Sequence, residues 1–307
     1  MKVAVTGATG FVGHRLVEQL QAEGHQVLVF VRNPDRAAQL FPTAAFPNVE
    51  IVRYTPLEAG DWQTKLTGCD GVVNLAGEPI SERWTAERKQ RIVDSRKLGT
   101  QALVQGIVQS EPKPQVLVNA SAIGFYGSSE TATFDESSQA GTGFLSEVCQ
   151  AWETEAQKVK VAGVRLVILR IGIVLGMGGA IAKMVTPFKL FAGGPIGSGK
   201  QWFSWIHRDD LVNLIVYALT QPEMAGTFNA TAPHPVRMES FCQTMGEVMG
   251  RPSWLPVPAF AIEVLLGDGA QVVLEGQEVR PKRTLESGFQ YQFPTVKPAL
   301  EEILKDA

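Results

Sequence analysis

The chain opens with Val3-Ala4-Val5 followed by Thr6-Gly7-Ala8-Thr9-Gly10-Phe11-Val12-Gly13. The β-branched run predicts a strand, and the pattern from Phe11 to Ala22 predicts an amphipathic helix. Glycines in the turn between them let the backbone approach a pyrophosphate closely, and the helix N-terminus attracts that anion. We therefore expect a nucleotide cofactor at this turn. The alternative is an ordinary glycine-rich turn, because the spacing G-x-x-G-x-x-G departs from the general G-x-G-x-x-G fingerprint.

The composition is that of a globular protein without nucleic-acid or membrane partners. The 307 residues are 45% hydrophobic and 19% charged, with a net charge of −3 and no basic stripe. The three cysteines lie far apart, which favours a reducing compartment and indicates no metal site. The apolar stretch from Leu211 to Leu219 is too short to cross a bilayer. We expect a cytoplasmic protein, or a stromal one if a plastid transit peptide has been removed from a longer precursor.

Strand and helix patterns alternate through the first two thirds of the chain. Apolar strands without clean alternation, separated by helices, favour a parallel sheet covered on both faces. The expected fold is α/β, with a doubly wound parallel sheet. The expected strands are 3–5, 26–31, 49–53, 71–75, 115–120, 165–169 and 227–229, and the expected helices are 11–22, 84–108, 144–159, 180–191, 209–219, 238–249 and 297–305.

The composition changes after about Gly172, where glycines and prolines become frequent. Such clusters indicate loops and domain connections. We predict a cofactor domain made of residues 1–175 and 205–232. A smaller C-terminal substrate domain is predicted to comprise residues 176–204 and 233–307.

The end of the second expected strand indicates which dinucleotide binds. In dinucleotide folds an acidic residue near this point binds the adenosine ribose and selects NAD, whereas a basic residue accommodates the 2′-phosphate of NADP. Here Arg32 follows the strand directly, with Arg36 nearby. A guanidinium matches phosphate geometry, so NADP(H) is favoured. The alternative for Arg32 is a solvated residue at a strand end.

Five segments, in the expected order, resemble extended short-chain dehydrogenases/reductases. They are 6–13, Asn74-Leu75-Ala76-Gly77, Leu98-Gly99-Thr100, the run 121–127 ending in Tyr126-Gly127, and 205–211. Further details, such as Gly77-Glu78-Pro79-Ile80, are similar to a poorly characterised subgroup described as sugar-nucleotide epimerase-like or cell-division-inhibitor-like. The resemblance implies a Rossmann fold that binds NADP(H). The cofactor contacts it implies are Gly7, Thr9, Gly10, Phe11, Val12, Arg32, Leu75, Ala76 and Gly77.

The chain lacks the catalytic pair of that superfamily, a tyrosine and a lysine four residues apart on one helix. None of the four tyrosines has a lysine four residues later, and the matching helix carries Leu145 and Cys149, or Phe144 and Val148, at those places. Three catalytic candidates remain, and each has a structural alternative. Ser121, whose register is uncertain by one residue, could instead be a loop hydroxyl. Tyr126 could be a packing residue, and Glu147 a solvated helix carboxylate.

Substrate contacts are expected from two regions. Glu78 follows the turn near which nicotinamide and substrate should meet. The glycine-rich loop 193–202 falls where relatives bind a nucleotide diphosphate, although a connection between domains would look the same. We predict substrate contacts from Glu78, Lys200, Trp202 and His207, with a structural histidine as the alternative for His207.

Two functions remain open at the level of sequence. The first is an NADP(H)-dependent oxidoreductase or epimerase with rearranged proton-transfer groups, acting on a carbonyl, alcohol or nucleotide-sugar-like substrate. The second is a catalytically inactive NADPH-binding regulatory protein, which the resemblance links to cell or plastid division. By analogy with the superfamily, the chain is expected to be a monomer or a homodimer.

Overall fold

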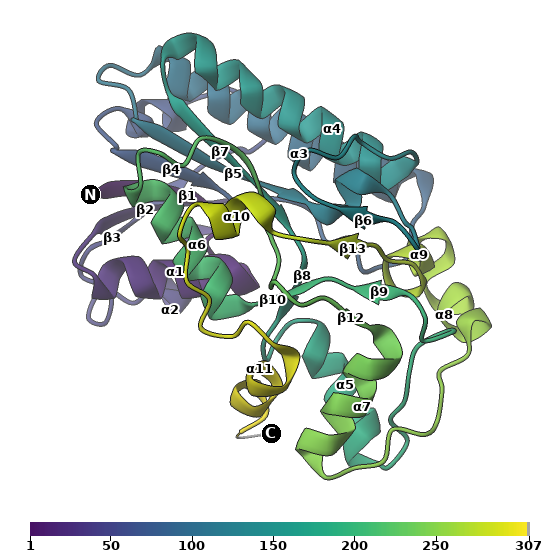
Figure 1. Ribbon diagram of the computed structural model, residues 1–307. Coiled ribbons are helices and arrows are strands. Elements are labelled where there is room, and N and C mark those ends of the chain that lie inside the picture. The colour runs from purple at the N-terminus through teal and green to yellow at the C-terminus, as the bar shows by residue number, and fades with distance from the viewer. Residues whose placement is uncertain (306–307) are drawn as a thin grey trace.

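The computed structural model describes residues 1–305, and its centre is a seven-stranded parallel sheet (Figure 1). The strand order is β11-β7-β5-β4-β1-β2-β3, so the chain reverses direction across the sheet beside β1. Every neighbouring pair is parallel, which confirms the predicted doubly wound sheet. The strands are β1 (Lys2–Thr6), β2 (Gln26–Val31), β3 (Val49–Arg53), β4 (Gly71–Asn74), β5 (Val116–Ala122), β7 (Arg165–Ile171) and β11 (Gly226–Ala230).

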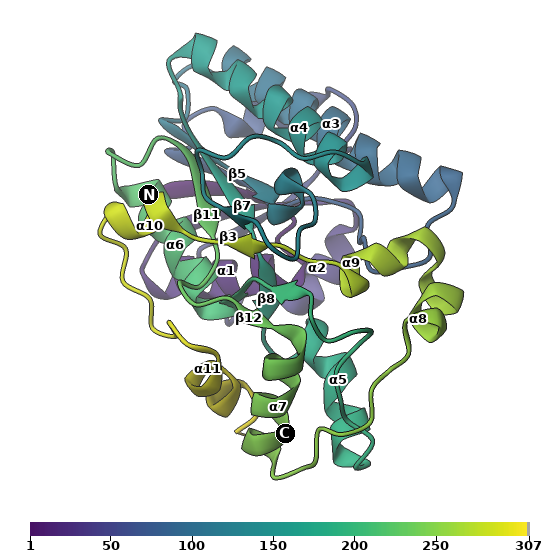
Figure 2. The same cartoon turned by 45° about the vertical axis from the view of Figure 1, so that its right-hand side comes forward.

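Helices cover both faces of the sheet, because the strands bury side chains on each side. Val3 and Val5 point into a core shared with α1 and α6, while Ala4 points into a second core shared with α3. Figures 1 and 2 show α3 and α4 side by side on one face. The helices of this layer system are α1 (Phe11–Ala22), α2 (Pro34–Leu40), α3 (Ala86–Gln109), α4 (Phe144–Gln157) and α6 (Arg208–Thr220).

A third hydrophobic core lies beyond the carboxyl ends of the strands. It contains fully buried Trp205 and Phe241, together with residues of α5, α7 and α11. These elements are α5 (Ala180–Lys189), β9 (Trp202–Phe203), β10 (Trp205–His207), β12 (Val236–Arg237), α7 (Met238–Met249) and α11 (Val296–Ile303). This separate core is consistent with a second domain, but the predicted domain boundaries stay a prediction.

The C-terminal segment returns to the sheet domain. Strand β13 (Glu278–Val279) pairs in parallel with β6 (Thr133–Phe134), and Ser129 N–H donates to the carbonyl of Gly276. Along the chain, α8 (Ala259–Leu266) and α9 (Gln271–Leu274) lie between α7 and β13. Helix α10 (Lys282–Glu286) follows β13. Figure 2 shows α8 at the periphery. The segment around α9 is therefore fixed beside the carboxyl edge of β5 and β7.

Candidate functional site

The turn between β1 and α1 is shaped by its glycines. Gly7 has φ +71°, and a Cβ there would lie 2.7 Å from the carbonyl carbon of Leu75. A Cβ on Gly13 would lie 2.2 Å from the oxygen of Gly7. Gly10 differs, since a Cβ there would meet only that same oxygen, at 3.2 Å. Its outer side is therefore open, and the space is a cradle that any larger side chain would fill.

The first turn of α1 leaves backbone donors for an anion. The first backbone bond of the helix runs from His14 N–H to Gly10 C=O. The N–H groups of Phe11 and Val12 precede that bond and have no intrahelical acceptor. Open space at Gly10 and these donors together suit the diphosphate of a dinucleotide. The residues present thus fit the cofactor that the sequence predicts.

A buried polar chain holds the turn after β4, residues 75–77, against β1. Asn74 accepts from Thr6 Oγ1 at 2.7 Å and donates to Thr100 Oγ1 and Asn119 Oδ1 at 3.0 and 2.7 Å. The N–H of Ala76 donates to Thr6 Oγ1 at 3.3 Å. The asparagine and threonine of the two short motifs are therefore supports of the cofactor edge, because their side chains are already hydrogen-bonded to one another.

Arg32 lies at the end of β2, where a 2′-phosphate would lie. Its side chain is 73% exposed and its Nη1 is 3.5 Å from Glu78 Oε1. Glu78 is also 3.5 Å from Arg88 on α3. The Glu78 carboxylate thus lies between Arg32 and Arg88, and Glu78 does not line the cavity described next.

A cavity of about 530 Å³, here named the α4 cavity, lies at the carboxyl edge of β5 and β7. Leu145 and Cys149 line it from α4, which supports that register for the missing tyrosine and lysine. The β5 end presents Ala122, one residue beyond Ser121. Burial raises the pKa of the Cys149 thiol to about 11. The helix face that carries the usual catalytic pair therefore presents an isobutyl group and a neutral thiol.

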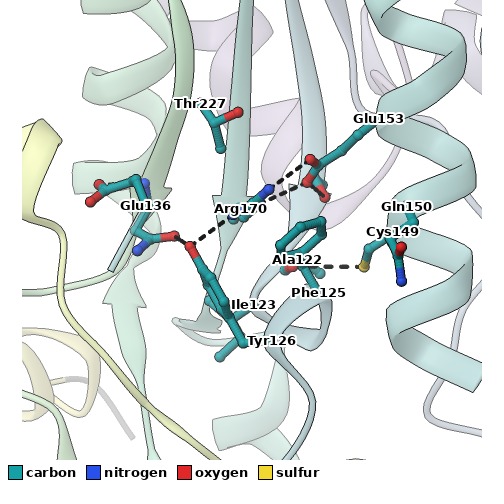
Figure 3. Close-up of polar contacts among 12 residues, drawn as sticks. Ala122, Ile123, Phe125, Tyr126, Glu136, Cys149, Gln150, Glu153, Arg170 and Thr227 are labelled. Atoms are coloured by element: carbon teal, nitrogen blue, oxygen red, sulfur yellow. Dashed lines mark hydrogen bonds and ion pairs between the residues drawn. The ribbon is translucent and has the colours of Figure 1, made fainter. Parts of the chain in front are cut away.

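Ser121 and Tyr126 belong to a buried network instead, and Figure 3 shows Tyr126, Arg170 and Glu153 of it. Ser121 Oγ donates to Glu153 at 2.7 Å, and Arg170 makes a bidentate pair with the same carboxylate at 2.8 Å for both contacts. Arg170 also donates to the Tyr126 hydroxyl, which donates to Asn229. Neither Ser121 nor Tyr126 lines the α4 cavity. Both hydroxyls are already hydrogen-bonded, Ser121 to Glu153 on α4 and Tyr126 to Arg170 on β7 and Asn229 on β11, so no proton-transfer step is assigned to them.

The other predicted site residues are scattered. Glu147 is exposed on α4 outside the cavity, and Lys200 is exposed on its loop. Trp202 does line the cavity, with its Nε1 donating to Glu130 C=O and the Arg237 guanidinium 3.8 Å from its ring. His207 caps α6 by accepting from Asp209 N–H, and its Nε2 is 2.9 Å from Glu302. Of the four predicted substrate contacts, the geometry brings only Trp202 to the cavity.

Arg96 and Trp152 are cavity residues that sequence reasoning did not single out. Arg96 lies on α3, four residues before the Thr100 of a recognised motif, and a Cβ on Gly77 would lie 3.1 Å from its Cζ. The guanidinium is 5.2 Å from the Trp152 ring. Arg96 thus contacts the cofactor edge and the cavity together. Its place two residues before the Leu98-Gly99-Thr100 motif was the one available signal.

The fold, the glycine cradle and the adjoining cavity define a dinucleotide-binding protein of the extended short-chain dehydrogenase/reductase class. The chain belongs to the NAD dependent epimerase/dehydratase family, whose model matches residues 3–230. A domain of unknown function, DUF1731, matches residues 257–303. Within residues 1–305, no helix has the length and apolar character needed to span a membrane.

The relatives share most of the chain. The chloroplastic homologue of epimerase family protein SDR39U1 from Arabidopsis thaliana is 51% identical, over 99% of this chain and 87% of its own. YfhF from Bacillus subtilis is 38% identical over 100% and 99%. The crystal structure of human SDR39U1 (isoform 2) with NADPH has a TM-score of 0.86 and 34% identity, with full coverage of both chains. Its NADPH agrees with the predicted cofactor class.

Proposed function

We propose that this chain binds NADPH across the carboxyl edge of its sheet. The glycine cradle and the first turn of α1 receive the diphosphate, and the turn 75–77 supports the nicotinamide half. Arg32, with Arg36 beside it, binds the 2′-phosphate. The human relative solved with NADPH supports the proposal, as does the absence of an acidic residue from β2.

The reaction we propose is hydride transfer between NADP(H) and a compact carbonyl or alcohol compound in the α4 cavity. The observation that carries it is Arg96, which donates to the Glu78 carbonyl beside Gly77 at the cofactor edge and also lines the cavity. A substrate there is adjacent to the cofactor's reactive end. When bound, NADPH supplies the hydride. The chain's own residues enclose and orient the carbonyl, mostly by apolar contacts from Ile123, Leu145 and Val148.

Proton transfer in this site cannot use a tyrosine on α4. Ser146 and Ser204 line the cavity, but their hydroxyls donate to backbone carbonyls. Cys149 keeps its proton at neutral pH, because burial raises the pKa of its thiol to about 11. Cys149 Sγ–H also faces a backbone carbonyl, that of Ala122, but at 3.7 Å, whereas the two serine contacts are 2.7 Å long. We propose this less tightly held Sγ–H as the donor from α4 to a developing alkoxide, with solvent as the source of reprotonation.

A nucleotide-sugar substrate is less well supported than a compact one. A diphosphate needs several cations or free N–H groups. Among the described residues that line the cavity, Arg96 is the one cation, while Lys200 lies outside. Solved UDP-glucuronic acid 4-epimerase from Bacillus cereus shares the fold at 17% identity and a TM-score of 0.80, and that likeness concerns the fold alone.

The test is turnover. Purified protein with NADPH is screened at 340 nm against small aldehydes, ketones and 2-oxo acids, and against UDP-sugars. We expect oxidation of NADPH with members of the compact set and none with UDP-sugars. The Cys149→Ala variant should lower kcat while leaving the Kd for NADPH unchanged. Activity confined to UDP-sugars would contradict the compact-substrate proposal.

A second function remains supported by the loss of the tyrosine and lysine. A chain that binds NADPH tightly but oxidises it with no compound of either set would be a regulatory protein that reports NADPH through its conformation. The two functions therefore differ in turnover and not in binding. The same screen, with binding measured in parallel, separates them.

A further inference from the structure

The α4 cavity has an uneven charge. Its described lining contains one cation, Arg96, and one carboxylate, Glu275. Glu275 is exposed to solvent after α9, where its charge is screened. Arg96, on α3, is half-buried where that helix packs against α4, and burial lowers its pKa. The partly desolvated charge in the cavity is therefore positive.

The Arg96 guanidinium is held in place by two carbonyls, and the Glu78 carboxylate acts on it only from beyond ion-pair distance. Its Nη1 donates to the carbonyls of Glu78 and Ile92 at 3.1 and 3.3 Å. Within residues 1–305 no carboxylate forms an ion pair with it, whereas Arg88, two turns earlier on α3, pairs with Glu78 and Glu82. Two carbonyls orient the group and leave Nε and Nη2 without a described protein acceptor. A half-buried cation in this state gains from an anion.

The cofactor does not supply that anion in the arrangement proposed above. In that arrangement the diphosphate belongs to the first turn of α1 and the 2′-phosphate to Arg32, whereas Arg96 meets the cofactor edge only at Gly77, on the nicotinamide side. The nicotinamide half that approaches Arg96 carries hydroxyl and amide groups. The remaining source of negative charge is the substrate.

We propose that Arg96 and Trp152 form a carboxylate subsite of the α4 cavity, so that the substrate is a carbonyl compound bearing a carboxylate. The Nε–H and Nη2–H groups of the guanidinium can donate two parallel hydrogen bonds to one carboxylate. The Trp152 ring, 5.2 Å from Cζ and 5% exposed, supports the guanidinium from α4 and walls the cavity. This inference rests on the proposed function, and it names the substrate class of that site.

The test uses the full chain saturated with NADP⁺, which blocks turnover. Binding of phenylglyoxylate and 2-oxobutanoate is compared with binding of their methyl esters by calorimetry. We expect each acid to bind at least ten-fold more tightly than its ester. Arg96→Gln should remove that preference and Arg96→Lys should keep part of it. Lys97→Gln, the same charge change at an exposed neighbour on α3, should leave it intact.

Three results would overturn the proposal. They are equal binding of acids and esters, no binding of either acid to the NADP⁺ complex, and an unchanged preference in Arg96→Gln. NADPH affinity of each variant is measured separately. A wild-type chain that binds no NADPH refutes the proposed function, whereas a chain that binds NADPH but shows no preference for acids refutes the carboxylate subsite alone. Arg96→Lys provides the comparison if Arg96→Gln does not fold.

Discussion

At the scale of single residues, the cofactor preference depends on Arg32. We predict that Arg32→Ala weakens NADPH binding by roughly 10- to 100-fold and NADH binding by less than about three-fold. A hydrogen-bonded charge pair is worth about 1.5–3 kcal/mol, and only NADPH offers the 2′-phosphate. Tryptophan fluorescence titration with both cofactors checks this. Equal losses for the two cofactors would exclude the phosphate role.

Arg32 forms an ion pair with Glu78, in which Nη1 lies 3.5 Å from Oε1. Because it competes with the 2′-phosphate for that guanidinium, Glu78→Gln should tighten NADPH binding by about two- to five-fold, as expected for a weak exposed pair. Glu82→Gln is the matched control, since Glu82 pairs with Arg88 but has no contact with Arg32. If Glu78→Gln weakens NADPH instead, the carboxylate orients Arg32 and does not compete.

At the scale of elements, the buried network of Ser121, Glu153, Arg170, Tyr126 and Asn229 stabilises the packing of β5, α4, β7 and β11. Glu153 and Arg170 are 7% and 5% exposed. Glu153→Gln leaves the Arg170 charge uncompensated, and we predict a loss of about 3–5 kcal/mol in the free energy of unfolding. Ser121→Ala removes one hydrogen bond and should cost about 1–2 kcal/mol. Urea denaturation measures both, and a Glu153→Gln protein as stable as the wild type would contradict this role.

Elements with a strong local sequence signal could be predicted, whereas short or uniformly apolar helices could not. Strands β1, β2 and β3 match their predicted bounds within a residue or two, because continuous apolar runs and flanking turns are local signals. Helix α2 was not predicted: its seven residues are too short for a periodic pattern, and Pro34 with the Asn33 cap starts it. Helix α8 was also missed, because apolar side chains fill seven of its eight positions and leave no polar face to give a helical period.

The candidate site was harder to predict than the fold. The glycine turn carries its chemistry in consecutive residues, so the glycines together with the strand before them and the helix after them indicated it. Arg96 and Ala122 reach the α4 cavity only because α3, α4 and β5 pack together. A strand alternates its faces at every residue, so the one-residue register uncertainty at Ser121 decided between a buried network and the cavity.

At the scale of the whole molecule, three buried thiols make the free energy of unfolding fall with rising pH in the alkaline range. Burial raises the pKa of Cys69 and Cys149 to about 11 and that of Cys242 to about 12, from an ordinary value of 9.0. The unfolded chain therefore loses these protons first. Their contribution is complete below about pH 9 and falls as pH rises to about 12.

The measurement is the urea midpoint as a function of pH from 8 to 12. Cys242→Ala should flatten the decline relative to wild type, and native thiols should react with a disulfide reagent much more slowly than unfolded ones at pH 8. Fast reaction of all three thiols in the native protein would contradict their burial.

The central claim is that the edge formed by the β1–α1 turn, Arg32 and the turn 75–77 binds NADPH beside the α4 cavity. The most direct test is a titration of the purified chain with NADPH and with NADH, in which binding is monitored by energy transfer from tryptophan to the reduced nicotinamide. The account predicts micromolar or tighter binding of NADPH, at least ten-fold tighter than NADH. Absence of binding for both, or a preference for NADH, would contradict it.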